Sequence, residues 1–182
     1  MEKLIENNYT KILDQEKISN IHFYWINFTW KDFSSKVFND CIFEKCNLSN
    51  INLRSTTFNN IEFSNSKIMW LKFVDLNYFL SNFNFSDCNI SLVSFYWMNL
   101  KNTNFNDCIL KETDFSNTNL ENVNFNYCDL EKSIFINCNF KKTNLIWSYN
   151  FSIDPTLNKL NKTKFSRENS IGLLSNLDII IE

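Results

Sequence analysis

The chain has 182 residues and a near-neutral charge, with 18 lysines and arginines against 20 aspartates and glutamates. Binding to a nucleic-acid backbone needs clustered cations, and no basic tract is present, so we expect no direct contact with nucleic acid. No apolar run reaches the roughly 18 residues of a membrane span, and the N-terminal residues lack the apolar stretch of a signal peptide. We therefore expect a single cytoplasmic domain with no membrane association.

Residues 1–20 mix charges with scattered apolar side chains and show no regular period. From residue 21 the pattern changes, because an apolar residue then recurs every five positions. A stack of repeats has an exposed end that must be covered. We expect residues 1–20 to form an N-terminal cap.

Residues 21–147 carry the five-residue period. Counting from Phe23 to Leu145 gives twenty-five apolar centres, all Phe, Leu or Ile, with one seven-residue step between Phe73 and Leu80. We number each repeat from one to five with the apolar centre at position three, as in the segment TNLEN. Position one is mostly small, and position two is commonly Asn or Asp. A short strand followed by a two-residue corner fits this period, whereas a 3.6-residue helix does not, so the chain should coil into a solenoid.

This unit resembles that of the pentapeptide-repeat family, and the resemblance covers residue 21 to about residue 147. It implies an all-β fold, a right-handed quadrilateral β-helix of about six coils with four repeats in each coil. Residues twenty apart should then stack in ladders, two of them aromatic, which would fill a narrow interior. One aromatic ladder comprises Phe23, Phe43, Phe63, Phe85, Phe105 and Phe125; the opposite one comprises Phe33, Leu53, Phe73, Phe95, Phe115 and Phe135.

The seven-residue step keeps this phase only if one repeat carries two extra residues. We expect a two-residue insertion within residues 74–79, seen as a bulge or small loop rather than a domain boundary. Position one holds lysine in the first coil, at Lys31 and Lys36. That coil should be open there, with the two amines reaching solvent.

After Trp147 the repeat stops, and Pro155 and Asn158 mark a turn. A short helix with its N-cap near Ser166 and an apolar, strand-like tail should follow. Residues 148–182 are therefore expected to form a C-terminal cap that covers the last coil or pairs with a second copy. The apolar tail residues assigned to that pairing are Leu173, Leu174, Leu177, Ile179 and Ile181.

The sequence offers little for catalysis. All six cysteines occupy position one, where a small filler is the simplest interpretation, and they lack the spacing of a metal site. The only histidine, His22, lies on an outward position, and paired acids such as Asp129 and Glu131 are expected on a solvated face. The only glycine is Gly172, which excludes a glycine-rich phosphate loop. We expect no enzyme activity, no cofactor and no metal.

All five tryptophans occupy position five, at a corner of the coil. Corner aromatics can cover neighbouring turns, or they can form a partner-binding surface, since Trp and Tyr are enriched in interface hot spots. Four of the corner residues fall in one column, two acids followed by two aromatic residues. This column is the candidate contact strip: Asp87, Asp107, Tyr127 and Trp147.

The C-terminal stretch from residue 153 to residue 182 is similar to that of the pentapeptide-repeat subgroup of quinolone-resistance (Qnr) and microcin-immunity proteins. The resemblance implies a homodimer that mimics DNA and protects DNA gyrase and topoisomerase IV from a poison, as antibiotic resistance or toxin immunity. Two departures favour the loop-poor, immunity-like members: residues 100–145 carry six acids against five bases, and long projecting loops are absent. The alternative is a scaffold or effector that binds an unrelated protein.

Overall fold

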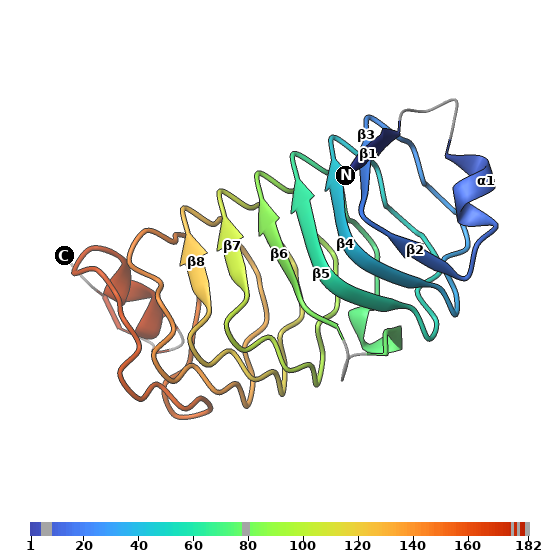
Figure 1. Ribbon diagram of the computed structural model, residues 1–182. Coiled ribbons are helices and arrows are strands. Elements are labelled where there is room, and N and C mark those ends of the chain that lie inside the picture. The colour runs from blue at the N-terminus through green and yellow to red at the C-terminus, as the bar shows by residue number, and fades with distance from the viewer. Residues whose placement is uncertain (5–8, 78–80, 176, 178, 181–182) are drawn as a thin grey trace.

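The computed structural model describes residues 1–4, 9–77, 81–175, 177, 179 and 180. The chain forms a parallel β-solenoid of about six coils with almost no helix, running as a rod from the N-terminus to the C-terminus (Figure 1). Its all-β class and its repeat architecture are those expected from the sequence.

Strands β4 and β5 each bend around a corner of the coil, and β2 pairs with residues 37–39 of β4, before that corner. After the corner, one side of the rod carries a continuous parallel sheet in the order β1-β3-β4-β5-β6-β7-β8. We call this the first side and number the others in chain order; along the rest of the coil, isolated parallel bridges such as Asn47 to Lys67 join successive turns. The strands are β1 (Glu2–Leu4), β2 (Lys17–Ser19), β3 (Ile21–Tyr24), β4 (Val37–Glu44), β5 (Thr57–Ser64), β6 (Phe83–Ser86), β7 (Asn104–Asn106) and β8 (Asn124–Asn126). The helical segments are α1 (Thr10–Leu13) and the 3-10 turns η1 (Phe73–Asp75) and η3 (Asn169–Leu173).

The register confirms four repeats per coil, because residues twenty apart are paired, as in Phe43 with Phe63 and Phe105 with Phe125. Rings of the first aromatic ladder stack nearly parallel, with centroids 4.8 to 5.3 Å apart. In the opposite ladder, Phe115 stacks on Phe95 at 5.3 Å. The spacing of the rings follows the spacing of the strands, so one geometry satisfies both backbone and core.

Position one does more than fill space. The hydroxyl of Thr118 donates to the carbonyl oxygen of Phe95 at 2.9 Å, and the thiol of Cys138 donates to that of Phe115 at 3.0 Å. In each case the acceptor is the central residue of the coil below, 23 residues earlier. A small side chain with a donor is therefore favoured there, because it satisfies a buried carbonyl.

Replacing Thr118 by valine should lower the free energy of unfolding by about 1–3 kcal/mol, since the shape is kept while the carbonyl of Phe95 loses its partner. Urea unfolding followed by circular dichroism measures this loss. Thr118→Ser keeps the donor and should cost less than Thr118→Val. Equal stability of Thr118→Val and the wild type would show that the hydroxyl contributes nothing.

The other positions explain how the chain turns with so little glycine. At position two, a side-chain oxygen accepts a hydrogen bond from the backbone N–H two residues later. The side-chain oxygen of Asn47, for example, accepts from the amide of Ser49 at 3.1 Å. At position five, nearly every repeat has a left-handed backbone, with φ from 50° at Asn65 to 65° at Asn102. Asn and Asp tolerate this conformation better than most residues, and they are frequent at these corners.

The register also locates the two extra residues. The amide of Asn77 bonds to the carbonyl of Thr56 with the usual offset of 21 residues, whereas Ile61 pairs with Phe83, 22 residues later. The additional residues therefore lie between Asn77 and Phe83, next to the turn η1. Part of the expected segment 74–79 falls within residues 78–80, which lie outside the described residues.

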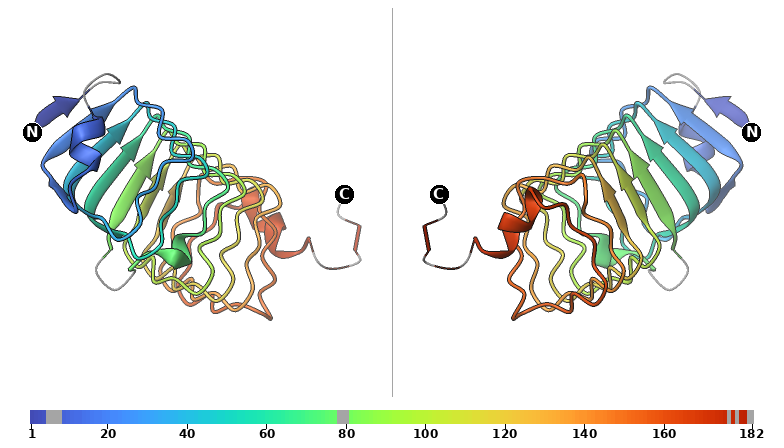
Figure 2. Two further views of the ribbon diagram at one scale, coloured as in Figure 1. Left: turned by 90° about the vertical axis from the view of Figure 1, so that its right-hand side faces the viewer. Right: turned by 90° about the vertical axis from the view of Figure 1, so that its left-hand side faces the viewer.

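The N-terminal segment contributes strands as well as a cover. β1 pairs with β3 and β2 pairs with β4, so parts of residues 1–20 extend the sheet. Tyr9 packs edge-on against Phe28, with ring centroids 5.0 Å apart. Nearby, Lys31 is exposed, whereas Lys36 is partly buried and its ammonium lies 3.4 Å from the carbonyl oxygen of Gln15. Figure 2 shows the N-terminal segment at one end of the rod and the C-terminal segment at the other.

The coil continues beyond Trp147, where the uninterrupted motif ends. Bridges from Asn139 to Lys159 and from Asn144 to Lys164 add almost a further turn, and Leu160 and Phe165 in that turn lie twenty residues after Phe140 and Leu145 and pack against the core. The expected boundary between repeat and cap therefore marks an interruption of the motif and not the end of the coil.

The C-terminal cap begins at Ser166, whose hydroxyl accepts from the amide of Asn169 at 3.1 Å. The Asn169 side chain in turn donates to the carbonyls of Leu145 and Ser148, at 2.6 and 3.0 Å, and so closes the last coil. A Cβ on Gly172 would lie 2.5 Å from the Phe151 ring, so only glycine fits this close approach. The expected strand-like tail is wrong for Leu177, Ile179 and Ile180, which have no strand neighbour.

Candidate partner-binding surface

The contact strip occupies the corner between the first and second sides. The amide of Asp87 bonds to the carbonyl of Asn106, and the amide of Asp107 bonds to that of Asn126, so each residue lies one coil from the next. Asp87, Asp107 and Tyr127 have φ values of 53°, 52° and 54°. The left-handed backbone holds all three side chains at the outer edge of the rod.

The two aromatic members of the strip pack on each other. The rings of Tyr127 and Trp147 are 5.8 Å apart at their centroids and inclined by 15°. They remain 54% and 58% exposed, because one ring face and the outer edges stay open to solvent. This stack forms a flat, rigid apolar platform of the kind that partners bind.

A groove opens beside Trp147, between the last coil and the C-terminal cap. Its volume is about 600 Å³, and it is mainly apolar. Tyr149 and Ile171, each about half exposed, contribute to its walls together with Phe151. The platform and the groove make the C-terminal end of this corner the most apolar part of the candidate surface.

Three acids elsewhere on the C-terminal half are paired with lysines. Lys111 lies 3.0 Å from Asp129 and 2.7 Å from Glu131, and Glu121 lies between Lys101 and Lys141, at 3.2 and 3.1 Å. Hydrogen bonds from the two lysines lower the pKa of Glu121 below its usual value. These acids are neutralised in place and contribute little to a negative field.

The two acids of the strip differ from those pairs. Asp87 and Asp107 are exposed, and within the described part of the chain neither forms an ion pair. Beside them, the first side carries uncharged amide ladders, such as Asn124 bonded to Asn104 at 2.8 Å. The negative charge along this corner is therefore limited to two carboxylates, with the aromatic platform beyond them.

Two of the buried thiols are held in their protonated form. Burial raises the pKa of Cys46 and of Cys138 to about 12 in each case, well above neutral pH. Thiolates are the nucleophilic and metal-binding form, so these side chains act as donors within the core. Among the described residues, no three metal-ligating side chains of His, Cys, Asp or Glu gather, and no helix is long and apolar enough to cross a membrane.

The residues assigned to dimerisation lie in different surroundings. Leu173 packs against the core, whereas Leu174, Leu177 and Ile179 are 39%, 56% and 52% exposed. Ile181 lies outside the described residues. Ile180, in the same apolar tail, is 90% exposed. Sequence reasoning missed Ile171, which faces the groove, because its surroundings depend on how the cap folds onto the last coil.

Comparison with protein families identifies the repeat. The model of pentapeptide repeats matches eight copies over residues 22–68, 79–107 and 113–148, which together are more than half of the chain. The chain belongs to the pentapeptide-repeat family. No protein with a curated description matches its sequence.

Two solved structures are similar to this chain. A trypsin-treated form of QnrB1, a plasmid-mediated fluoroquinolone resistance protein, is 17% identical, with a TM-score of 0.59 and coverage of 100% of this chain and 95% of that one. HetL, involved in heterocyst differentiation regulation in the cyanobacterium Nostoc sp. strain PCC 7120, is 14% identical, with a TM-score of 0.44 and coverage of 81% and 86%. At 17% identity the likeness to QnrB1 shows the fold alone.

Proposed function

We propose that this pentapeptide-repeat protein is a non-catalytic cytoplasmic protein that binds DNA gyrase or topoisomerase IV and protects it from a topoisomerase poison. The observation that carries the proposal is the corner strip, in which two unpaired carboxylates lead to a stacked aromatic platform on a rigid rod. The carboxylates imitate a short stretch of phosphates, and the platform supplies apolar contact. The fold shared with a fluoroquinolone resistance protein supports the same proposal.

Direct binding to purified gyrase, measured by surface plasmon resonance, tests this proposal. Binding at low micromolar concentration that weakens with added salt is the expected result, since exposed carboxylates act through a screened field. Asp87→Asn and Asp107→Asn together should reduce the salt dependence while the rod remains folded. Absence of binding to both gyrase and topoisomerase IV at micromolar concentration would contradict the proposal.

A second candidate is a scaffold that binds an unrelated protein through its aromatic corners. The pairing of Lys111 with two acids and of Glu121 with two lysines favours it, because the surface around the strip is close to neutral. Affinity capture with the intact protein separates the two candidates. Recovery of topoisomerase subunits supports the first, and recovery of another protein that requires Tyr127 and Trp147 supports the second.

The exposed apolar residues of the C-terminal segment lead us to propose that the protein is a homodimer joined there. Leu174→Asp and Ile180→Asp should each yield a monomer, because an ionised carboxylate is costly to bury in an apolar interface. Light scattering measures the mass. If the wild type and both variants all have the mass of a monomer, this segment only caps the rod and does not join two copies.

A further inference from the structure

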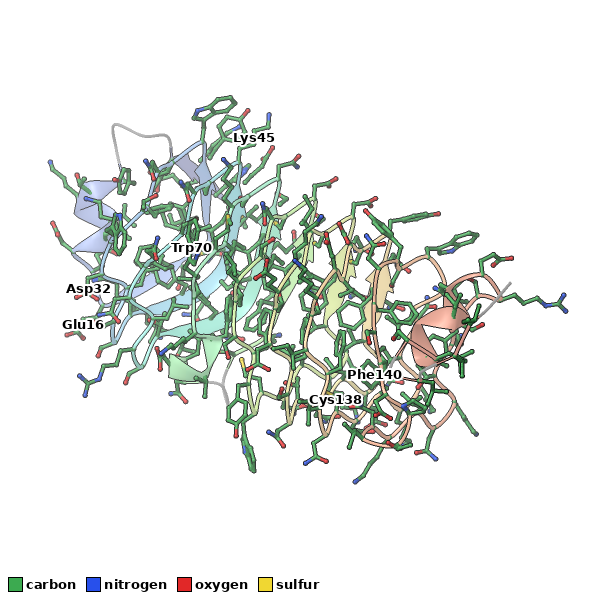
Figure 3. The ribbon with its side chains drawn as sticks, turned by 180° about the vertical axis from the view of Figure 1, so that it is seen from behind. Glu16, Asp32, Lys45, Trp70, Cys138 and Phe140 are labelled. Carbon is green, nitrogen blue, oxygen red and sulfur yellow. The ribbon has the colours of Figure 1, made fainter. Side chains whose placement is uncertain are left out.

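The C-terminal part of the chain is strongly basic, although the whole chain is close to neutral. Between residues 141 and 167 it carries six lysines and arginines and one acid, Asp154, whereas the overall formal charge is −2. This stretch begins directly after the buried Phe140, which Figure 3 labels near the C-terminal end of the rod. The positive charge is therefore concentrated at one end of the molecule.

The coil gathers four of these cations at the corner between the fourth and first sides. The amide of Lys142 bonds to the carbonyl of Asn161, so Lys142 and Lys162 lie one coil apart, about 4.8 Å at the usual strand spacing. The backbone bridges of Lys159 and Lys164 place them on the fourth and first sides of the last coil, on either side of Lys162. We call these four residues the basic corner: Lys142, Lys159, Lys162 and Lys164.

The charge of the basic corner is not cancelled by the acids around it. All four lysines are exposed, and none forms an ion pair with another described residue. Glu121, on the fourth side, is already bound by two other lysines. The carboxylate of Asp154 accepts hydrogen bonds within its own turn. Arg167 is followed by Glu168 in the cap, so that pair adds little net charge. The corner therefore presents about four positive charges to solvent.

The outward residues next to these lysines are polar, and most of them are amides: Asn122, Asn139, Asn144 and Asn161. Stable membrane binding takes apolar insertion in addition to cations, and binding of single-stranded nucleic acid relies on bases stacked on aromatic rings. The basic corner supplies cations and amides instead. Lysine and asparagine side chains are among the groups that bind the phosphates of a duplex. Duplex DNA also offers a dense array of charge, one for about every 1.7 Å of its axis.

We propose that the basic corner binds the phosphate backbone of duplex DNA, independently of base sequence. The lysines act as point charges toward phosphates of the two strands, and the amides between them donate to phosphate oxygens. The sequence predicts no such contact, because its lysines form no continuous tract. The register of the coil nevertheless brings together lysines twenty residues apart. The inference rests on charge and register, so it holds whether or not the contact strip binds a topoisomerase.

Fluorescence anisotropy with a labelled DNA duplex of about 20 base pairs, titrated with the intact protein, tests this inference. We expect a Kd below about 100 µM at about 50 mM salt. A plot of the logarithm of the association constant against that of the salt concentration should have a slope between about −3 and −4. Each phosphate contact contributes about −0.9 to this slope, and the basic corner has four cations.

Lys142→Gln combined with Lys162→Gln should reduce the magnitude of the slope by about two and weaken binding at least tenfold at about 50 mM salt. Thermal unfolding should stay as in the wild type, since both side chains are exposed. The matched control combines Lys67→Gln with Lys72→Gln. These two lysines are also exposed, lie on the second and third sides, and change the net charge by the same amount. The control should bind DNA as the wild type does.

Three results would overturn the proposal. The first is no binding of the wild type to the duplex at about 100 µM protein and about 50 mM salt. The second is equal weakening by the two double variants, which would assign the effect to net charge. The third is tighter binding to an RNA duplex of the same sequence, or to vesicles of phosphatidylserine and phosphatidylcholine in equal parts. Trp147→Ala should leave DNA binding unchanged, so this outcome is separate from that of gyrase binding.

Discussion

Replacing Phe115 by alanine should lower the free energy of unfolding by about 3–5 kcal/mol, the largest effect expected of any single core substitution here. Phe115 is fully buried and stacks between Phe95 and Phe135, at 5.3 and 5.2 Å. Its edge also meets Phe105 and Phe125, with centroids 6.2 and 5.7 Å away. Removing the ring leaves a cavity that the rigid coils above and below cannot close. Urea unfolding of the purified variant measures the loss.

Phe115→Leu is the matched control for this substitution. Leucine already occupies the same ladder at Leu53, where it is 3% exposed, so the slot accepts it. The variant should retain more than half of the stability that Phe115→Ala loses, because a smaller cavity remains. Equal losses for the two variants would show that the aromatic stack itself, and not the filled volume, holds the coils in register.

Replacing Trp147 by alanine should weaken binding to the topoisomerase about 30-fold, which corresponds to about 2 kcal/mol. The expectation rests on the proposed function. Trp147 is 58% exposed, and its ring forms both the top of the stack with Tyr127 and one wall of the adjacent groove. The rod should remain folded, since few core contacts are lost. Surface plasmon resonance with immobilised gyrase measures the change.

Trp97→Ala is the matched control for this substitution. It removes an indole of similar exposure, 62%, from position five at a corner away from the strip. Its affinity for gyrase should match that of the wild type. If Trp97→Ala and Trp147→Ala weaken binding equally, the exposed indoles contribute only non-specific apolar contacts, and the strip is not the contact surface.

Much of the fold is predictable because the five-residue period imposes both backbone and core. Ladders such as Phe63 on Phe85 follow from counting alone, once the seven-residue step is treated as one longer repeat. The alignment of Tyr127 with Trp147 follows in the same way, since residues twenty apart must stack. Periodicity therefore predicts the position of a corner residue as well as that of a core residue.

Features that do not obey the period are harder to predict. The groove at Trp147 depends on the cap folding back so that Gly172 meets Phe151, a contact between segments with no shared pattern. Lys111 pairs with Asp129 eighteen residues away, off the twenty-residue spacing, so this contact depends on side-chain reach between coils. The pairing of Glu121 with Lys101 and Lys141, in contrast, joins residues twenty apart and does follow the period. The donor role of residues such as Thr118 was also missed, because size alone accounts for the pattern at position one.

Drug-stabilised DNA cleavage by gyrase in the presence of this protein tests the central functional claim most directly. Cleavage with a fluoroquinolone should fall as the wild-type protein is added over the micromolar range, and Trp147→Ala should require a higher concentration. Topoisomerase IV with the same drug provides the parallel measurement. Unchanged cleavage with both enzymes, together with unchanged supercoiling and no binding at micromolar protein, would contradict the proposal that this rod protects a type II topoisomerase.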